Sequence, residues 1–159
     1  MMRCYLAVTL MFATLAGGCG GGDGAVASGG ANPVGEAGAE DNSRVFFIAP
    51  QDGEMISVDL AVVFEFGSEN LRIDAAPETV ETVRPTLGHY HLGANTTCLP
   101  AGEIIPQADP WIDLGDGSDT IEMFFEPGEY TFAVQAGDDE HRALNTPCET
   151  ISLTVEDGV

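Results

Sequence analysis

The sequence TIEMFFEPGEYTFAV, residues 120–134, alternates between apolar and polar residues on both sides of a Pro-Gly pair. The apolar residues on one face of the extended chain are Ile121, Met123, Phe125, Tyr130, Phe132 and Val134. A period of two residues is typical of a strand that buries one face. This stretch therefore predicts two strands joined by a tight turn at Pro127-Gly128, which together would form a β-hairpin.

The same alternation continues in both directions along the chain. Further strands are expected at Val45–Ile48, Val58–Phe66, His89–Gly93 and Ile151–Val155. Between Leu71 and Arg84 the chain is polar and could form one helical turn at residues 77–80. Short strands separated by turns predict an all-β fold, an antiparallel immunoglobulin-like β-sandwich of about seven strands.

The N-terminus has the pattern of an export signal. Arg3 precedes the apolar run Tyr5–Leu15, which at about 11 residues is too short to span a bilayer as a helix. The following residues Leu15–Cys19, LAGGC, resemble the lipobox of bacterial lipoproteins. The resemblance implies a cleaved signal peptide at residues 1–18 and a diacylglycerol on the Cys19 thiol. A secretory signal that is cut near Ala16 and leaves Cys19 unmodified is the alternative.

The segment after the cysteine predicts a flexible tether. Residues 19–42 are rich in Gly and Ala and hold too little apolar surface to offset the entropy of ordering. Residues 43–159 remain for a single β-sandwich domain. Gly20 follows the cysteine, and by resemblance to proteobacterial lipoproteins this favours the outer membrane. We therefore expect a cell-envelope protein, held to the membrane by its lipid anchor and facing the periplasm or the cell surface.

Charge and cysteine usage narrow the range of partners. The chain has 26 acidic and 5 basic residues, a formal net charge of −21, which excludes nucleic acid and anionic lipid surfaces as partners. An envelope protein or a metal ion remains as a candidate, and the sequence indicates no oligomeric state. Cys4 leaves with the signal peptide and Cys19 takes the lipid, so Cys98 and Cys148 are expected to form a disulfide. Thiolate ligation of a metal is the alternative.

Two histidines lie on one expected strand. His89 and His91 are two residues apart, so both side chains project from the same face, whereas Tyr90 and Leu92 would point to the core. Imidazole is a common ligand of copper and zinc. The spacing predicts either a pair of metal ligands or a pair of surface histidines that bind no metal.

A third histidine follows the last expected hairpin. His141 ends the acidic loop GDDEH, residues 137–141, in which Asp138 and Glu140 could complete or orient a ligand set. If this loop lies beside the histidine strand, the three imidazoles would form a Cu²⁺ or Zn²⁺ site. The candidate metal residues are therefore His89, His91 and His141, with Asp138 and Glu140 as auxiliary groups.

Four motifs carry a resemblance that covers about residues 44–155. They are VFFIAPQDG at 45–53, GHYHL at 88–92, PGEYTF at 127–132, and GD at 137–138 with His141. In this order they resemble domain-of-unknown-function family 4399, a family of small bacterial exported domains. Tyr90 stands where the family usually has a middle histidine, and Cys98 is not expected from the family. The resemblance implies the domain and its histidine cluster but names no reaction.

Other motifs are weaker. The segment 113–119, DLGDGSD, is rich in acids and glycine, but it lacks the ligand spacing of an EF-hand and predicts a turn between strands. On this reading Asp113 lies outside the metal site. No nucleophile elbow or phosphate loop occurs, so we expect a binding module and not an enzyme. A structural or protein-interaction domain without metal is one alternative. A metal-assisted hydrolase is the second, and it would need an open coordination position in a concave pocket.

Overall fold

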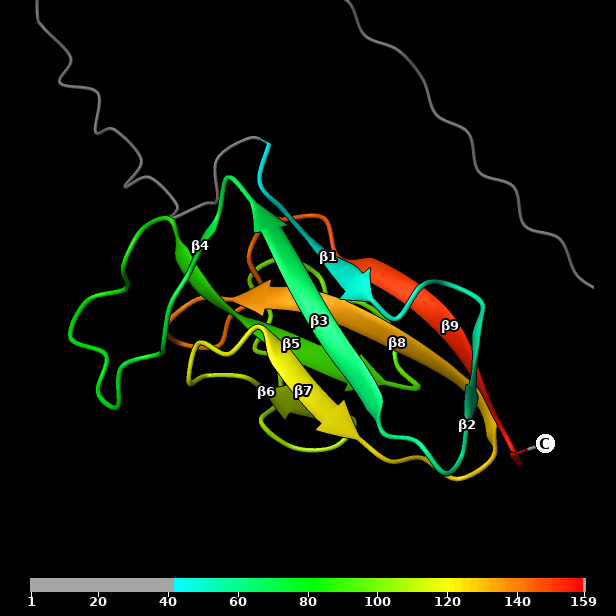
Figure 1. Cartoon of the computed structure of the whole chain (residues 1–159). Helices are drawn as coiled ribbons and strands as arrows, with labels where there is room; N and C mark the ends of the chain where they lie inside the picture. Colours follow the sequence, from blue (N-terminus) through cyan, green and yellow to red (C-terminus); the bar gives the residue numbers. More distant parts are fainter. Residues whose placement is uncertain (1–41, 159) are drawn as a thin grey trace, which may run out of the picture. The chain divides into compact units, whose positions relative to one another are not determined.

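The computed structural model describes residues 42–158, coloured from cyan to red in Figure 1. The predicted signal peptide, the predicted lipidation site Cys19 and tether residues 20–41 lie outside the described residues, as does residue 159. Among the described residues, no helix is long and apolar enough to cross a membrane.

The described chain is built from β-strands arranged in two sheets (Figure 1). The strands are β1 (Arg44–Ala49), β2 (Glu54–Ser57), β3 (Val62–Glu69), β4 (Arg72–Ile73), β5 (Leu87–Ala94), β6 (Trp111–Asp113), β7 (Thr120–Met123), β8 (Gly128–Gly137) and β9 (Glu149–Glu156). One sheet has the order β1-β3-β7. The other has the order β2-β9-β8-β5-β4, with β6 also paired to β5. The prediction of an all-β, sandwich-like fold is confirmed, with nine strands instead of about seven.

The core lies between the two sheets because alternate residues of each strand point inward. In β3, Val62, Phe64 and Phe66 are buried and the residues between them are exposed. Phe64 packs against Phe132 of β8, with ring centroids 4.7 Å apart. Fully burying such side chains stabilises a fold by roughly 1.5–3 kcal/mol each. The apolar face of the alternation therefore holds the two sheets together.

The predicted hairpin at Pro127-Gly128 is wrong. β7 pairs with β3 in the first sheet, whereas β8 pairs with β5 and β9 in the second. Between them, Phe125 packs against Phe64 and Phe132 across the core. The connection therefore crosses from one sheet to the other. Both strands have the expected alternation, because a period of two residues shows which side chains are buried but not which strand is the neighbour.

Three other details differ from the sequence prediction. The pairs β2–β9 and β4–β5 are parallel, so the second sheet is mixed and not purely antiparallel. Leu60 is exposed in a turn, and the strand expected from Val58 begins only at Val62. The expected helical turn at residues 77–80 is absent from the described chain. The immunoglobulin-like topology stays a prediction.

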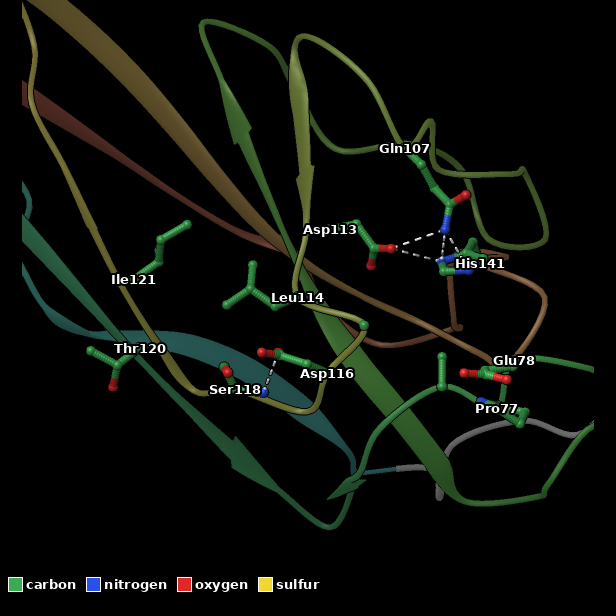
Figure 2. A pocket seen from close by; sticks show the side chains of 12 residues that line it. Pro77, Glu78, Gln107, Asp113, Leu114, Asp116, Ser118, Thr120, Ile121 and His141 are labelled. Atoms are coloured by element: carbon green, nitrogen blue, oxygen red, sulfur yellow. Dashed lines mark hydrogen bonds and ion pairs between the residues drawn. The ribbon is translucent and has the colours of Figure 1, made fainter.

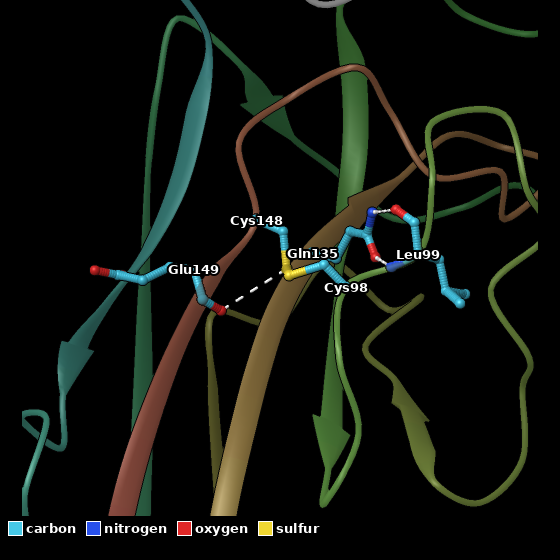
Figure 3. Close-up of a disulfide and its surroundings, with 5 residues drawn as sticks. All are labelled: Cys98, Leu99, Gln135, Cys148 and Glu149. Carbon is cyan, nitrogen blue, oxygen red and sulfur yellow. Dashed lines mark hydrogen bonds between the residues drawn. A yellow bond between two sulfur atoms is a disulfide. The ribbon is translucent and has the colours of Figure 1, made fainter.

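Loops cover the outer face of the second sheet and are fixed there by a disulfide. Cys98 and Cys148 are bonded, with Cα atoms 6.0 Å apart (Figure 3). The side-chain amide of Gln135 accepts from Leu99 N–H and donates to Leu99 O, at 2.9 and 2.7 Å. Closing a loop of this length stabilises a fold by about 4 kcal/mol in the chain-entropy model. The predicted disulfide is present, and it holds the loop after β5 against the sheet.

A second, smaller apolar cluster lies beneath these loops. Its buried members are Ile105, Trp111, Ala133 and Ala143. Ala133 faces away from the main core, because its neighbours Phe132 and Val134 in β8 face into it. The outer face of β8 and β5 is therefore buried as well, and this is the face that carries the histidines.

Candidate metal centre

Strand β5 places two histidines under the loops. His89 and His91 are 1% and 0% exposed, while Tyr90 and Leu92 between and after them pack into the main core. The alternation across the two faces is as the sequence predicts. The two histidines are not on the surface, however, because Asp113 of β6 (Trp111–Asp113) and His141 lie against them.

The loop after β8 brings the third histidine to the same place. The three imidazole rings converge. The ring centroid of His89 lies 4.6 Å from that of His91 and 4.7 Å from that of His141, and the centroids of His91 and His141 are 5.5 Å apart. The backbone of His141 is left-handed, with φ of 59°. This conformation is uncommon outside glycine and persists where surrounding contacts impose it. Here His141 N–H donates to Asp138 O at 2.9 Å and Ile105 N–H donates to His141 O at 2.7 Å.

A fourth group, Asp113, completes the cluster. Short strand β6 runs antiparallel to β5, and Asp113 lies opposite His91 in the register. Its carboxylate therefore projects on the same face as the histidines. The sequence prediction that Asp113 lies in a turn outside the site is wrong. The three residues of β6 are too few to show a strand pattern, and nothing local shows that they pair with β5.

The distances between the four side chains fit a small divalent ion. Nε2 of His89 lies 3.0 Å from Nδ1 of His141 and 3.2 Å from Oδ1 of Asp113. The nearest approaches of Asp113 to Nδ1 of His141 and Nδ1 of His91 are 3.6 and 3.8 Å. One ligand atom from each residue lies within 4.8 Å of all the others. In a tetrahedral site, four ligand atoms at ~2.0–2.1 Å from Zn²⁺ lie about 3.3 Å from one another. The distances of 3.0, 3.2, 3.6 and 3.8 Å between side chains of the cluster lie on both sides of this value.

Polar atoms in the cluster lack partners. Among residues 42–158, both ring nitrogens of His91 and Oδ1 of Asp113 are buried without a hydrogen bond. Buried polar atoms without partners cost free energy, so native structures rarely leave them. Nδ1 of His91 and Oδ1 of Asp113 lie 3.8 Å apart, so one bound cation could satisfy both, whereas Nε2 of His91 points toward Gly137.

His89 and His91 are held in the neutral form that ligation requires. Burial, together with the neighbouring His89 and His141, lowers the pKa of His91 to about 3. Burial also lowers the pKa of His89, partly opposed by the charge of Asp113. Neutral imidazoles carry a free lone pair, so at neutral pH no proton has to leave these two rings before a metal binds.

Gly137 gives His91 its space. A Cβ atom on Gly137 would lie 2.6 Å from Nε2 of His91, closer than real Cβ atoms approach. A side chain at this position would therefore push the ring out of the cluster.

The two auxiliary acids of the sequence prediction do not join the cluster. Oδ1 of Asp138 accepts the N–H groups of Glu140 and Arg142, at 2.8 and 2.9 Å, and so shapes the loop that carries His141. Glu140 is paired at the surface with Arg142, 3.2 Å away. Asp138 thus stabilises the loop that carries His141, and Glu140 does not belong to the cluster.

An ion pair between two loops supports the same region. Asp139, whose side chain is 2% exposed, accepts from the guanidinium and the backbone N–H of Arg84, with a shortest distance of 2.7 Å. These hydrogen bonds lower the pKa of Asp139. Arg84 also donates to Ala75 O at 2.7 Å. It therefore ties the segment between β4 and β5 to the loop of His141.

A cleft opens beside the cluster (Figure 2). It has a volume of about 700 Å³, and both Asp113 and His141 line it. Gln107 lies over these two residues, with its amide nitrogen 2.9 Å from Oδ2 of Asp113 and 2.7 Å from Nε2 of His141. The sequence contains no pattern that marks Gln107, because it reaches the site from an irregular loop.

Comparisons with known proteins point to one family. No curated protein and no solved structure matches the chain significantly. A family model described as "Domain of unknown function (DUF4399)" matches residues 64–156, a stretch that contains all three histidines and Asp113. This match spans more than half of the chain, and it establishes that the protein belongs to the DUF4399 family.

Proposed function

We propose that this domain is a metal-binding module that holds one Cu²⁺ or Zn²⁺ ion through His89, His91, His141 and Asp113. The observation that carries the proposal is the convergence of four ligand atoms from three separate strands and loops within 4.8 Å of one another. Nδ1 of His91 and Oδ1 of Asp113, which are buried without hydrogen bonds, support it, because one cation would satisfy both.

The chemistry of the ligands favours copper or zinc over harder ions. Three imidazole nitrogens and one carboxylate suit Zn²⁺ and Cu²⁺, whereas Ca²⁺ and Mg²⁺ bind mainly oxygen. The proposed role is binding and not catalysis. A metal-free structural or interaction domain is the rival that the experiment below must exclude.

The N-terminal sequence supports a place for this module in the cell envelope. The sequence LAGGC at residues 15–19 and the Gly- and Ala-rich segment after it resemble the corresponding segments of bacterial lipoproteins. We propose that a lipid on Cys19 anchors the protein to the outer membrane, with the domain facing the periplasm or the cell surface.

The test is calorimetric titration of the full-length protein, expressed with its own N-terminus and purified in detergent without a histidine tag. One equivalent of Cu²⁺ or Zn²⁺ should bind with a dissociation constant well below ~0.1 mM. His89→Ala, His141→Ala and Asp113→Asn should each weaken binding by about tenfold or more. Asp59→Asn changes an exposed acid outside the cluster and should bind as the wild type does.

Two outcomes would contradict the proposal. One is the absence of Cu²⁺ and Zn²⁺ binding tighter than ~0.1 mM by the wild-type protein. The other is tight binding that the three cluster variants leave unchanged, since the ion would then sit elsewhere on this acidic chain.

A further inference from the structure

The cleft next to the proposed metal centre has no role in the proposed function. Four separate segments line it: residues 76–78, residues 113–121, the loop of Gln107 and the loop of His141 (Figure 2). A backbone hydrogen bond of 2.8 Å from Ala76 N–H to Gly115 O joins the first two segments. Two of the segments that line the cleft are therefore held together by the backbone.

The metal centre has one side that a ligand can reach. His89 and His91 are fully buried, whereas the side chains of Asp113 and His141 are 22% and 21% exposed and line the cleft. An ion bound by the four residues would therefore meet solvent only from the cleft. Cu²⁺ in tetragonal sites and Zn²⁺ in open sites both accept a further ligand in such a position.

The lining of the cleft selects by charge. It contains Glu78 and Asp116 besides Asp113, and no Lys or Arg is among its lining residues. Ser118 N–H donates to the Asp116 carboxylate at 2.9 Å and lowers the pKa of Asp116. Part of the lining is apolar, from Pro77, Leu114 and Ile121. The cleft therefore disfavours anions and favours a compact ligand that carries a positive charge at one end.

From this arrangement we infer that the cleft binds a small organic cation whose neutral nitrogen donor takes an open coordination position on the metal. The positive end of this ligand lies against Glu78 and Asp116, and its apolar body lies against Pro77, Leu114 and Ile121. This inference rests on the proposed metal-binding function. No bond other than the nitrogen–metal coordination forms.

Gln107 lies across the entrance to that position. Its amide contacts Asp113 and His141, the two metal ligands that line the cleft, and its side chain is exposed. An exposed side chain can move aside at little cost. The ligand would therefore replace the Gln107 amide over the metal centre, and Gln107→Ala should strengthen ligand binding.

The experiment compares three pyridines that share one donor atom and differ in charge. Full-length protein is loaded with Cu²⁺, or with Co²⁺ as a spectroscopic substitute if only Zn²⁺ binds. It is then titrated with 4-(aminomethyl)pyridine, 4-methylpyridine and pyridine-4-carboxylate, and the d–d absorption band is followed. None of the three can chelate the metal away through adjacent donors. The cation should shift the band and bind about fivefold more tightly than the neutral compound, and the anion should bind most weakly.

Variants locate the charge selectivity. In the double variant Glu78→Gln, Asp116→Asn, the affinities for the cation and the neutral compound should become equal, while metal affinity stays as in the wild type. Glu126→Gln, which changes an exposed acid outside the cleft, should keep the wild-type order.

Each failure has a distinct meaning. If metal binds but none of the three compounds shifts the band, the coordination is closed and the inference is wrong. The inference is equally wrong if pyridine-4-carboxylate binds as tightly as the cation, or if the double variant keeps the wild-type preference. If no metal binds at all, the proposed function itself fails, and the inference fails with it.

Discussion

His91 is the residue whose environment is hardest to explain without a ligand. Its ring is fully buried, and neither nitrogen has a hydrogen bond within the described chain. Burial lowers its pKa to about 3, so the ring stays neutral far below neutral pH. A neutral, unpartnered imidazole in the interior costs free energy that a coordinated ion would offset.

This burial predicts how the stability of the metal-free protein depends on pH. In the unfolded chain a histidine titrates near pH ~6.5, whereas folded His91 takes up a proton only near pH 3. Below pH ~6.5 the unfolded state therefore binds more protons, and the free energy of unfolding decreases as the pH falls. The loss from His91 should approach about 1.4 kcal/mol per pH unit.

Denaturant unfolding between about pH 6.5 and 5 measures this effect before most carboxylates protonate. His91→Gln should reduce the slope relative to the wild type, because it removes the group that titrates. The remaining slope should include a contribution from His89, whose pKa is also lowered by burial. Equal slopes in wild type and His91→Gln would show that His91 is not buried in neutral form.

Among the residues of the cluster, the three histidines could be predicted from the sequence as candidate metal ligands, and Asp113 could not. His89 and His91 share a face because of strand geometry alone, and this follows from two residues of sequence spacing. Asp113 joins them only because β6 pairs with β5 across a long loop. Asp113 belongs to the cluster because of the register between β5 and β6, which no local sequence pattern indicates.

Among the elements, the strands could be predicted more reliably than their neighbours. Alternation identifies which residues of β1, β3, β5, β7, β8 and β9 face the core between the sheets, but not that the outer face of β5 and β8 is buried as well. It cannot show that β7 and β8 belong to different sheets, because two strands of a hairpin would have the same alternation of apolar and polar residues. Strands β2, β4 and β6 have two to four residues each, too few for a period of two to stand out.

The ion pair between Arg84 and Asp139 should be the most sensitive contact between the elements around the site. Arg84→Met removes the guanidinium from the buried Asp139 carboxylate and leaves it only the backbone N–H of residue 84, so the free energy of unfolding should fall by more than an exposed ion pair contributes. Arg142→Met breaks the exposed pair with Glu140 and should cost less than about 1 kcal/mol. Chemical denaturation of both variants measures the difference, and a loss in Arg84→Met no larger than in Arg142→Met would refute the structural role of this pair.

For the whole molecule, the charge agrees with the proposed role in binding cations. A formal net charge of −21 raises the concentration of cations around the protein and repels nucleic acid. These properties follow directly from composition, as does the expectation of a tethered domain. The position of the loops over the histidine face does not, because it depends on the disulfide and on packing between distant segments.

The proposed lipid anchor gives a prediction for the full chain. Cells that express the wild-type protein and are fed labelled palmitate should incorporate the label into it, and Cys19→Ser should abolish the incorporation. Cys4→Ser is the matched control, because Cys4 lies within the predicted signal peptide and should leave the labelling intact. Absence of label from the wild type would contradict the lipoprotein proposal.

The central claim is that three imidazoles and one carboxylate hold a single ion, and X-ray absorption at the metal edge tests it most directly. The metal-loaded protein should show a first shell of nitrogen and oxygen at ~2.0–2.1 Å, with the outer-shell scattering of three imidazole rings. In Asp113→Asn the three imidazoles should remain, and in His91→Gln one should be lost. A first shell without imidazole scattering, or one of carboxylate oxygens alone, would contradict the account and place the ion elsewhere on the acidic surface.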